Sequence, residues 1–236
     1  MSTMSDEPRQ AARADAFREL AMARRSCRAF LPTAVPKQTI TEILKVAQRA
    51  ASWCNTQPWQ VIVTSGEAPE RFRKSLYEHA AEQGSRYVSD VPMPPAYTGV
   101  HLERRRETGW QLYEAVGIER GDRAASGRQA LRNYEFFDAP HVAIITVDAG
   151  LGPYAILDTG VYLGQLLLAA ESFGVGATAQ AALATYSPFI RDFFDIAEDR
   201  AVLVGVSFGW PDDDHPANSY RTNRADVEDV ATWIEH

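Results

Sequence analysis

The 236-residue sequence predicts a single α+β domain in which helices surround a mainly antiparallel sheet. Three segments have the composition of strands, and longer segments with helical periodicity lie between them. We find no internal repeat and no low-complexity linker that would divide the chain. Residues 1–12 are polar, and we expect them to form a flexible N-terminus ahead of one domain over residues 13–236.

The first half of the chain contains three predicted helices and one predicted strand. Residues 14–25 form a helix with apolar side chains along one face. Residues 36–51 form a second helix, because Pro36 suits a first helical turn and apolar residues repeat at helical spacing after it. Residues 59–64, WQVIVT, are rich in β-branched side chains and therefore predict a strand. Residues 69–82 predict a helix that is mostly solvated.

A proline-rich excursion separates the first strand from the second. Residues 91–99 contain three prolines, which block regular backbone pairing, so this stretch is predicted to be a loop. It leads into a charged helix over residues 101–116, which carries Trp110 and Tyr113. Such an excursion is typical of a lid or a binding loop, and it is equally compatible with a plain connecting helix.

The second half contains a buried strand, an apolar helix and a final strand. Residues 141–147, HVAIITV, are almost continuously apolar, which predicts a strand buried on both faces. Residues 153–173 form a helix that is apolar nearly all round, so we expect it at the centre of the molecule or in a subunit interface. Gly160 and Gly164 within it would let another helix approach closely. Residues 201–208, AVLVGVSF, predict the last strand.

Charge and composition exclude several classes of protein. A formal net charge of -7 and a pI near 5.3 argue against nucleic acid or an anionic membrane as a partner. Cys27 and Cys54 form no CxxC pair and the histidines are scattered, so neither a disulfide framework nor a metal site is predicted. We interpret the acidic run over residues 212–214 as solvated surface. No apolar run reaches the roughly 18 residues of a membrane span, and the start lacks a signal-peptide layout, so a cytoplasmic protein is expected.

Two polar stretches carry the chemistry of the chain. Residues 24–28, RRSCR, place three arginines at the end of an apolar helix, and guanidinium groups match phosphate oxygens. A solvated basic helix end is the alternative interpretation. Residues 52–57, SWCNTQ, form a polar turn whose hydroxyl and amide groups can satisfy the carbonyls and ring nitrogens of a heterocycle. Together the two stretches suit a phosphorylated ring cofactor.

The same two stretches resemble the amino-terminal signature of the FMN-dependent nitroreductase family. In that family a run similar to Arg-Arg-Ser-x-Arg-x-Phe is followed by Pro-Ser-x-x-Asn-x-Gln-Pro-Trp, and here the runs are RRSCRAF at residues 24–30 and ASWCNTQPW at residues 51–59. Ala51 stands in place of the usual proline. Residues 173–183, FGVGATAQAAL, and residues 218–224, NSYRTNR, extend the resemblance toward the C-terminus.

The middle of the chain resembles the subgroup that reduces nitrobenzoate-type aromatics, through residues 109–118 and 132–140. The resemblance implies an intertwined homodimer of the nitroreductase-like fold, with FMN at the subunit interface. Arg24, Arg28 and Arg224 would hold the flavin phosphate. The full set of implied cofactor-binding residues is Arg24, Arg25, Ser26, Arg28, Ala51, Ser52, Trp53, Asn55, Gln57, Asn133, Gln180, Ala181, Ala182, Arg221 and Arg224. The implied substrate-binding residues are Trp53, Trp110 and Tyr113.

The implied activity is NADPH- or NADH-dependent reduction of a nitroaromatic or quinone-like acceptor by ping-pong hydride transfer. No catalytic side chain is predicted, because the cofactor carries the reaction and no nucleophile–base pair is found in the sequence. Ser52, Trp53 and Asn55 would come from the partner subunit. Two alternatives stay open: another reaction on the same fold, such as reductive dehalogenation or flavin fragmentation, and a low-turnover flavin-binding or regulatory protein.

Overall fold

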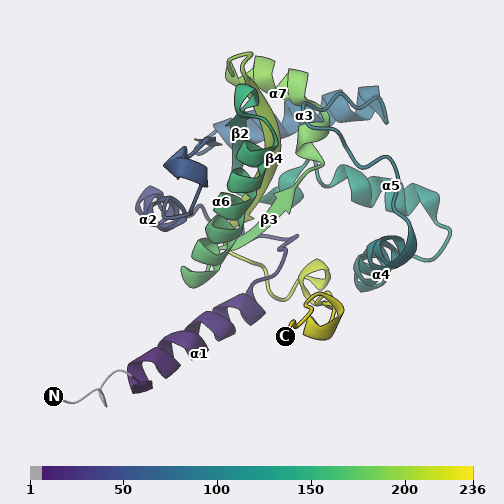
Figure 1. The fold of residues 1–236 in the computed structure, drawn as a ribbon. Coiled ribbons are helices and arrows are strands. Elements are labelled where there is room, and N and C mark those ends of the chain that lie inside the picture. The colour runs from purple at the N-terminus through teal and green to yellow at the C-terminus, as the bar shows by residue number, and fades with distance from the viewer. Residues whose placement is uncertain (1–6, 236) are drawn as a thin grey trace.

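The computed structural model describes residues 7–235 and contains a four-stranded sheet with helices on both faces (Figure 1). The strands are β1 (Trp59–Val63), β2 (His141–Asp148), β3 (Gly176–Gln180) and β4 (Arg200–Gly209), and their order in the sheet is β1-β2-β4-β3. All three pairings are antiparallel. The predicted α+β class with a mainly antiparallel sheet is therefore confirmed.

Two hydrophobic layers sandwich the sheet. On one face α2 (Lys37–Ala47) and α6 (Pro153–Ser172) pack together over the strands, with Ile43 and Tyr162 in the shared core. On the other face α3 (Ala68–Gln83) and α7 (Ser187–Phe194) contribute Phe72 and Ile190 to a second core. The central strand β2 is buried on both faces, as its apolar sequence predicts.

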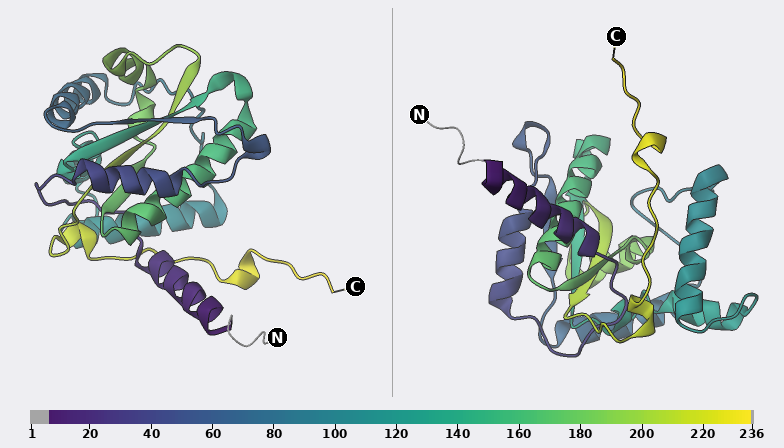
Figure 2. Two further views of the ribbon diagram at one scale, coloured as in Figure 1. Left: turned by 90° about the vertical axis from the view of Figure 1, so that its left-hand side faces the viewer. Right: turned by 90° about the horizontal axis from the view of Figure 1, so that it is seen from below.

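Two segments extend away from this body. Helix α1 (Glu7–Ala23) has no buried residue, and the C-terminal segment, residues 219–235, also leaves the body (Figure 2). The helix begins at Glu7 and not at residue 14, so residues 7–12 are helical where a flexible N-terminus was expected. Residues 1–6 of that expected segment lie outside the described part of the chain.

The proline-rich excursion forms a loop and two projecting helices, α4 (Gly99–Ala115) and α5 (Arg123–Leu131), on the right-hand side of Figure 1. Neither helix has a buried residue, so both lie on the body and not within it. The loop over residues 91–99 was predicted, whereas α5 and α7 were not identified from the sequence. Among residues 7–235, no helix is long and apolar enough to cross a membrane.

The structure refines the description of three further segments. Helix α3 is not mostly solvated, because Phe72, Leu76 and neighbouring residues on one face are buried in the second core. Strand β3 was not among the predicted strands, yet its five residues pair with β4 along their whole length. Helix α6 is buried on one face only, because the face that carries Leu157 and Gly160 is exposed, and of its two predicted positions the subunit interface stays a prediction.

Candidate cofactor-binding site

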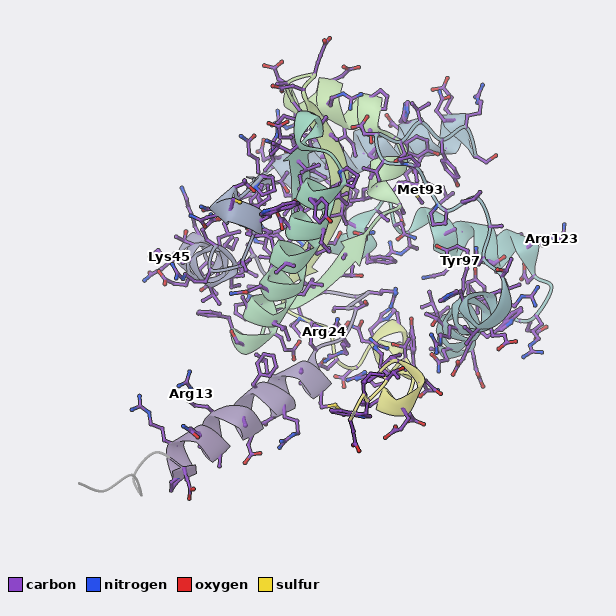
Figure 3. The ribbon with its side chains drawn as sticks, viewed as in Figure 1. Arg13, Arg24, Lys45, Met93, Tyr97 and Arg123 are labelled. Atoms are coloured by element: carbon purple, nitrogen blue, oxygen red, sulfur yellow. The ribbon has the colours of Figure 1, made fainter. Side chains whose placement is uncertain are left out.

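A cavity of about 750 Å³ lies between the end of α1, helix α4 and the C-terminal segment; we call it the arginine cavity. Arg24 follows the last residue of α1 and is labelled there in Figure 3. Within residues 7–235, the cavity is lined by six arginines and one acidic residue, Glu107. The six arginines are Arg24, Arg25, Arg28, Arg104, Arg221 and Arg224. The structure therefore brings together all five arginines that the sequence motifs singled out.

The arginine-rich segment is fixed along the edge of the sheet. After α1 ends, Ser26 forms a bridge with Ala177 of β3, and the backbone N–H of Cys27 donates to the Ala177 carbonyl at 3.1 Å. A Cβ at Gly176 would lie 3.0 Å from the Cys27 Sγ, so any larger residue would have to displace the Cys27 side chain, and glycine suits this close approach. Burial raises the pKa of the Cys27 thiol, which is thereby kept neutral beside the arginines.

Asn218 brings the C-terminal arginines to the same place. Its side-chain oxygen accepts a hydrogen bond from the Arg28 backbone nitrogen at 2.7 Å. Its amide nitrogen donates to the carbonyls of Ala29 at 2.9 Å and Asp212 at 2.7 Å. Arg28 in turn donates to the Tyr220 hydroxyl at 2.9 Å. The residues that follow Asn218 are therefore held over the arginine cavity, because each donor and acceptor of its buried side chain is used.

Protein groups neutralise only part of the positive charge in the arginine cavity. Arg25 pairs with Asp213, yet its Nε is buried and has no partner among the described residues. Arg221 and Arg224 donate to backbone carbonyls of their own segment, at 3.0 Å and 3.1 Å. Within residues 7–235, the Arg24 guanidinium has no hydrogen bond or ion pair. Several guanidinium groups that converge on one cavity, with the Arg24 donors and the Arg25 Nε left over, fit a phosphate dianion, and so fit the phosphate of FMN.

The end of β3 forms a second part of the candidate site. The buried side chain of Gln180 accepts a hydrogen bond from the Ser207 hydroxyl and donates to the backbone oxygen of Asn133 at 2.9 Å and to its side-chain oxygen at 3.2 Å. Gln180 therefore orients Asn133, which comes from the end of α5. Ala181 and Ala182 follow without a bulky side chain, so a flat ligand can approach their backbone.

The turn over residues 52–57, the 52–57 turn, lies elsewhere in the same chain. The backbone N–H of Trp53 faces both carboxylate oxygens of Asp158 at 3.1 Å, and the Trp53 ring packs against Tyr154 with centroids 4.5 Å apart. Both partners belong to the start of α6, whereas the arginine segment meets β3 just after the end of α6. From Asp158 to Ser172 the helix rises about 21 Å. One chain therefore does not bring the 52–57 turn to the arginine cavity.

The 52–57 turn has its own internal bonds. Ser52 Oγ accepts from the Gln57 backbone nitrogen at 3.0 Å, and the Gln57 side chain accepts from Gln48 at 2.9 Å. Asn55 is exposed and adopts a positive φ, and Ala51 is exposed just before the turn. These predicted cofactor ligands thus form one ordered group, separate from the arginines.

The predicted substrate-binding residues of α4 lie apart from the lining of the arginine cavity. The rings of Trp110 and Tyr113 are 5.8 Å apart, and Arg120 lies over Trp110 at 4.9 Å. The same helix lines the cavity through residues that sequence reasoning missed, Arg104 and Glu107 among them. Their spacing of three places both on one helix face, which is a signal that could have identified them.

The described residues contain no group of three or more side chains that could hold a metal ion. The acidic run that was interpreted as solvated surface is exposed at Asp213 and Asp214, and Asp213 pairs with Arg25. This run therefore balances charge beside the arginine cavity. Asp158 is a further residue that sequence reasoning did not assign to the site.

Comparison with known proteins gives concordant matches. The model of the family described as "Nitroreductase family" matches residues 21–210. Nitroreductase NfnB of Mycolicibacterium smegmatis is 35% identical over 221 residues, which cover 93% of each chain. A 4-nitrobenzoate reductase of Pseudomonas putida is 33% identical over 210 residues, covering 89% of this chain and 92% of the relative. The crystal structure of FMN-dependent NfnB from Mycobacterium smegmatis in complex with NADPH has a TM-score of 0.89 at 34% identity, covering 94% of this chain and 99% of that chain.

Proposed function

The chain belongs to the nitroreductase family, and from that premise we propose that it is an FMN-dependent NAD(P)H oxidoreductase that reduces nitroaromatic or quinone-like acceptors by ping-pong kinetics. The similar structure from M. smegmatis is described as FMN-dependent and contains NADPH, and the P. putida relative is named for nitrobenzoate reduction. These names support a nitroaromatic acceptor and a reduced nicotinamide donor, NADPH or NADH, for this chain.

The arginine cavity is the observation that carries the proposal. Arg24 and Arg28 come from one segment and Arg224 from another about 200 residues later, and a phosphate dianion would be their shared partner. The buried, unpartnered Nε of Arg25 is a further donor that such a phosphate could satisfy, and leaving it unpaired would be costly. Arg221 lines the same cavity as a weaker candidate because its guanidinium already donates to backbone carbonyls.

The remaining residues would position the ring of the cofactor. FMN, when bound, supplies the group that accepts and returns a hydride. The Ser207–Gln180–Asn133 hydrogen bonds hold Asn133 at the end of β3, where it can meet the edge of a heterocycle. The backbone N–H groups of Ala181 and Ala182 would donate to the ring, since no large side chain shields them.

A second copy of the chain would complete the site. Because the 52–57 turn and the arginine cavity are at opposite ends of α6, we place Ser52, Trp53 and Asn55 against the flavin of the partner subunit in a homodimer. The exposed stripe of α6 supports this arrangement. It consists of Leu157, Gly160, Val161 and Gly164, which repeat at helical spacing. A side chain added at either glycine meets nothing within 4 Å, so that face is open to a neighbouring helix.

Cofactor content and turnover test the proposal together. The purified protein should show a flavin absorbance spectrum and oxidise NADPH when 4-nitrobenzoate is added, with the parallel double-reciprocal plots of ping-pong kinetics. Replacing Arg24 or Arg28 by Ala should weaken FMN binding at least tenfold, because a charge-assisted hydrogen bond contributes about 1.5–3 kcal/mol. Arg18→Ala is the matched control, since Arg18 is exposed on α1 and pairs with Asp15.

Each other outcome points to one alternative. A yellow protein without acceptor-stimulated turnover would indicate a flavin-binding or regulatory protein. Halide release from a haloaromatic without nitro reduction would indicate a reductive dehalogenase, and breakdown of the flavin itself would indicate flavin fragmentation. A colourless protein with no affinity for FMN would contradict the proposal as a whole.

A further inference from the structure

The 52–57 turn is held in a conformation that its residues do not favour. Cys54, Asn55 and Gln57 have φ values of 51°, 57° and 46°, in the left-handed region that suits glycine. Asparagine tolerates this region, whereas cysteine and glutamine do not favour it, so the surrounding structure must hold Cys54 and Gln57 there. Backbone strain of this kind persists only where other contacts hold it, and it gathers at functional sites.

Asp158, in the first turns of α6, holds the 52–57 turn through its carboxylate group. Both of its carboxylate oxygens are 3.1 Å from the Trp53 backbone nitrogen. Its side chain is only 7% exposed, and within residues 7–235 this backbone group is its only hydrogen-bond partner. Burying a carboxyl group is costly unless it is well hydrogen-bonded, so this placement is unfavourable for the fold by itself. Its evident structural effect is to fix Trp53.

Tyr154 holds the side chain of the same residue. It precedes Asp158 by four positions, so both lie on one face of α6. The Trp53 and Tyr154 rings meet edge to face, with centroids 4.5 Å apart and planes at 77°. Trp53 and Tyr154 are each 58% exposed, so both keep surface that a ligand or a second subunit can contact. Trp53 is thus anchored twice, at its backbone by Asp158 and at its ring by Tyr154.

We propose that Tyr154 and Asp158 form a clamp that fixes Trp53 as a rigid aromatic wall of the acceptor pocket, and that this wall selects flat aromatic acceptors. The proposal rests on the function proposed above, because the pocket is formed where the 52–57 turn meets the flavin of the partner subunit. Asp158 is then a positioning residue and Tyr154 a specificity-determining residue. A fixed indole favours planar rings, since stacking requires parallel or offset faces and an immobile wall loses no freedom on binding.

Acceptor kinetics of the holoenzyme test the clamp. Tyr154→Ala should raise the KM for 4-nitrobenzoate about three- to tenfold, the range expected from losing one aromatic contact. The KM for ferricyanide, which has no aromatic ring, should not change. Tyr154→Phe keeps the ring edge and should restore the KM. Tyr77→Ala on α3, across the sheet, is the control for removing a tyrosine. If Tyr154→Ala changes the KM for 4-nitrobenzoate and the KM for ferricyanide by the same factor, Tyr154 has no selective role.

A spectroscopic readout tests the clamp without turnover. Protein labelled with 5-fluorotryptophan has five tryptophan positions, and Trp53→Phe identifies the Trp53 signal by fluorine NMR. Tyr154→Ala and Asp158→Ala should shift and narrow the Trp53 signal alone, whereas Asp158→Asn keeps an accepting oxygen and should remain close to wild type. An unchanged Trp53 signal in Tyr154→Ala would overturn the clamp, even if the buried Asp158 variants fail to fold.

The two proposals fail in different ways. If wild-type protein does not reduce 4-nitrobenzoate, the proposed function is wrong, and the clamp is judged by titrating the FMN-bound protein with 4-nitrobenzoate while the fluorine signals are recorded. A shift confined to Trp53, lost in Tyr154→Ala, would support the aromatic wall. No shift at Trp53 would overturn it.

Discussion

The side-chain oxygen of Asn218 lies 2.7 Å from the backbone nitrogen of Arg28, although 190 residues separate the two in the sequence. The same side chain also donates to two backbone carbonyls. This single buried amide therefore fastens the segment that carries Arg221 and Arg224 to the segment that carries Arg24 and Arg28. The arginine cavity depends on it.

Replacing Asn218 by Ala should destabilise the protein and weaken FMN binding. Three hydrogen bonds are lost and their backbone partners stay buried, so we expect a loss of about 2–4 kcal/mol in the free energy of unfolding. Urea denaturation checks the stability, and flavin titration checks the binding. Asn223→Ala is the control for stability, because Asn223 is exposed and bonds only to Glu107 among the described residues; its effect should stay within about 0.5 kcal/mol. Equal stability of the two variants would contradict the role of Asn218.

Gly205 in β4 should not tolerate a side chain. A Cβ at this position would overlap the side chain of Leu183, which is fully buried. Gly205→Ala should therefore lower the free energy of unfolding by about 1–3 kcal/mol through overpacking. Gly127→Ala in α5 is the matched control, because a Cβ there meets nothing within 4 Å and alanine favours helix by up to about 1 kcal/mol. Thermal unfolding should show a lower melting temperature for Gly205→Ala and an equal or higher one for Gly127→Ala. An unchanged melting temperature in Gly205→Ala would contradict the tight packing of Gly205 against Leu183.

Acid should lower the stability of the fold by protonating Asp138, which lies in the turn after α5. A hydrogen bond from Arg132 holds the pKa of Asp138 below its usual value, so the folded protein keeps the charge to lower pH than the unfolded chain does. The stabilisation is therefore fully present above about pH 4 and is lost as the pH falls through the lowered pKa. Asp138→Asn should reduce stability at neutral pH by less than about 1 kcal/mol, since the pair is partly exposed, and should flatten the acid decline.

Denaturation midpoints between about pH 2.5 and pH 7 measure this effect. Asp214→Asn serves as the control because Asp214 is an exposed acid on another turn. If Asp138→Asn and wild type lose stability in parallel on acidification, Asp138 does not carry the proposed pH dependence.

The exposed face of α6 should govern association. Gly160→Leu places a large side chain on the stripe that we assign to the dimer interface, and overpacking there should raise the dimer dissociation constant about ten- to hundredfold. FMN should be lost with the partner, because the 52–57 turn of the other subunit would no longer reach it. Gly127→Leu, at another exposed helical glycine, is the control. Analytical ultracentrifugation measures the mass of the particle in solution and so distinguishes monomer from dimer. If the Gly160→Leu protein stays dimeric, the interface does not include this face of α6.

The sequence was most informative where local chemistry decides structure. Strand β2 is recognisable because most of its buried residues are apolar. Helix α2 is recognisable because Pro36 precedes a segment whose apolar residues repeat at helical spacing. Strand β3 was not recognisable, because GATAQ has little intrinsic preference for strand. Its conformation comes from pairing with β4, a contact that no local pattern encodes.

In the candidate site, too, some features follow from local sequence and others only from tertiary packing. By itself the sequence determined that three arginines follow α1, that a polar turn precedes β1, and that both match one family signature, because these are short-range patterns. The family resemblance implied that Arg224 joins the first arginines, but only the tertiary structure decided that Asn218 fastens the two segments together and that Asp158 holds the 52–57 turn at the far end of α6. Such contacts depend on how helices and strands pack across more than 100 residues of chain, and packing is a property of the whole fold.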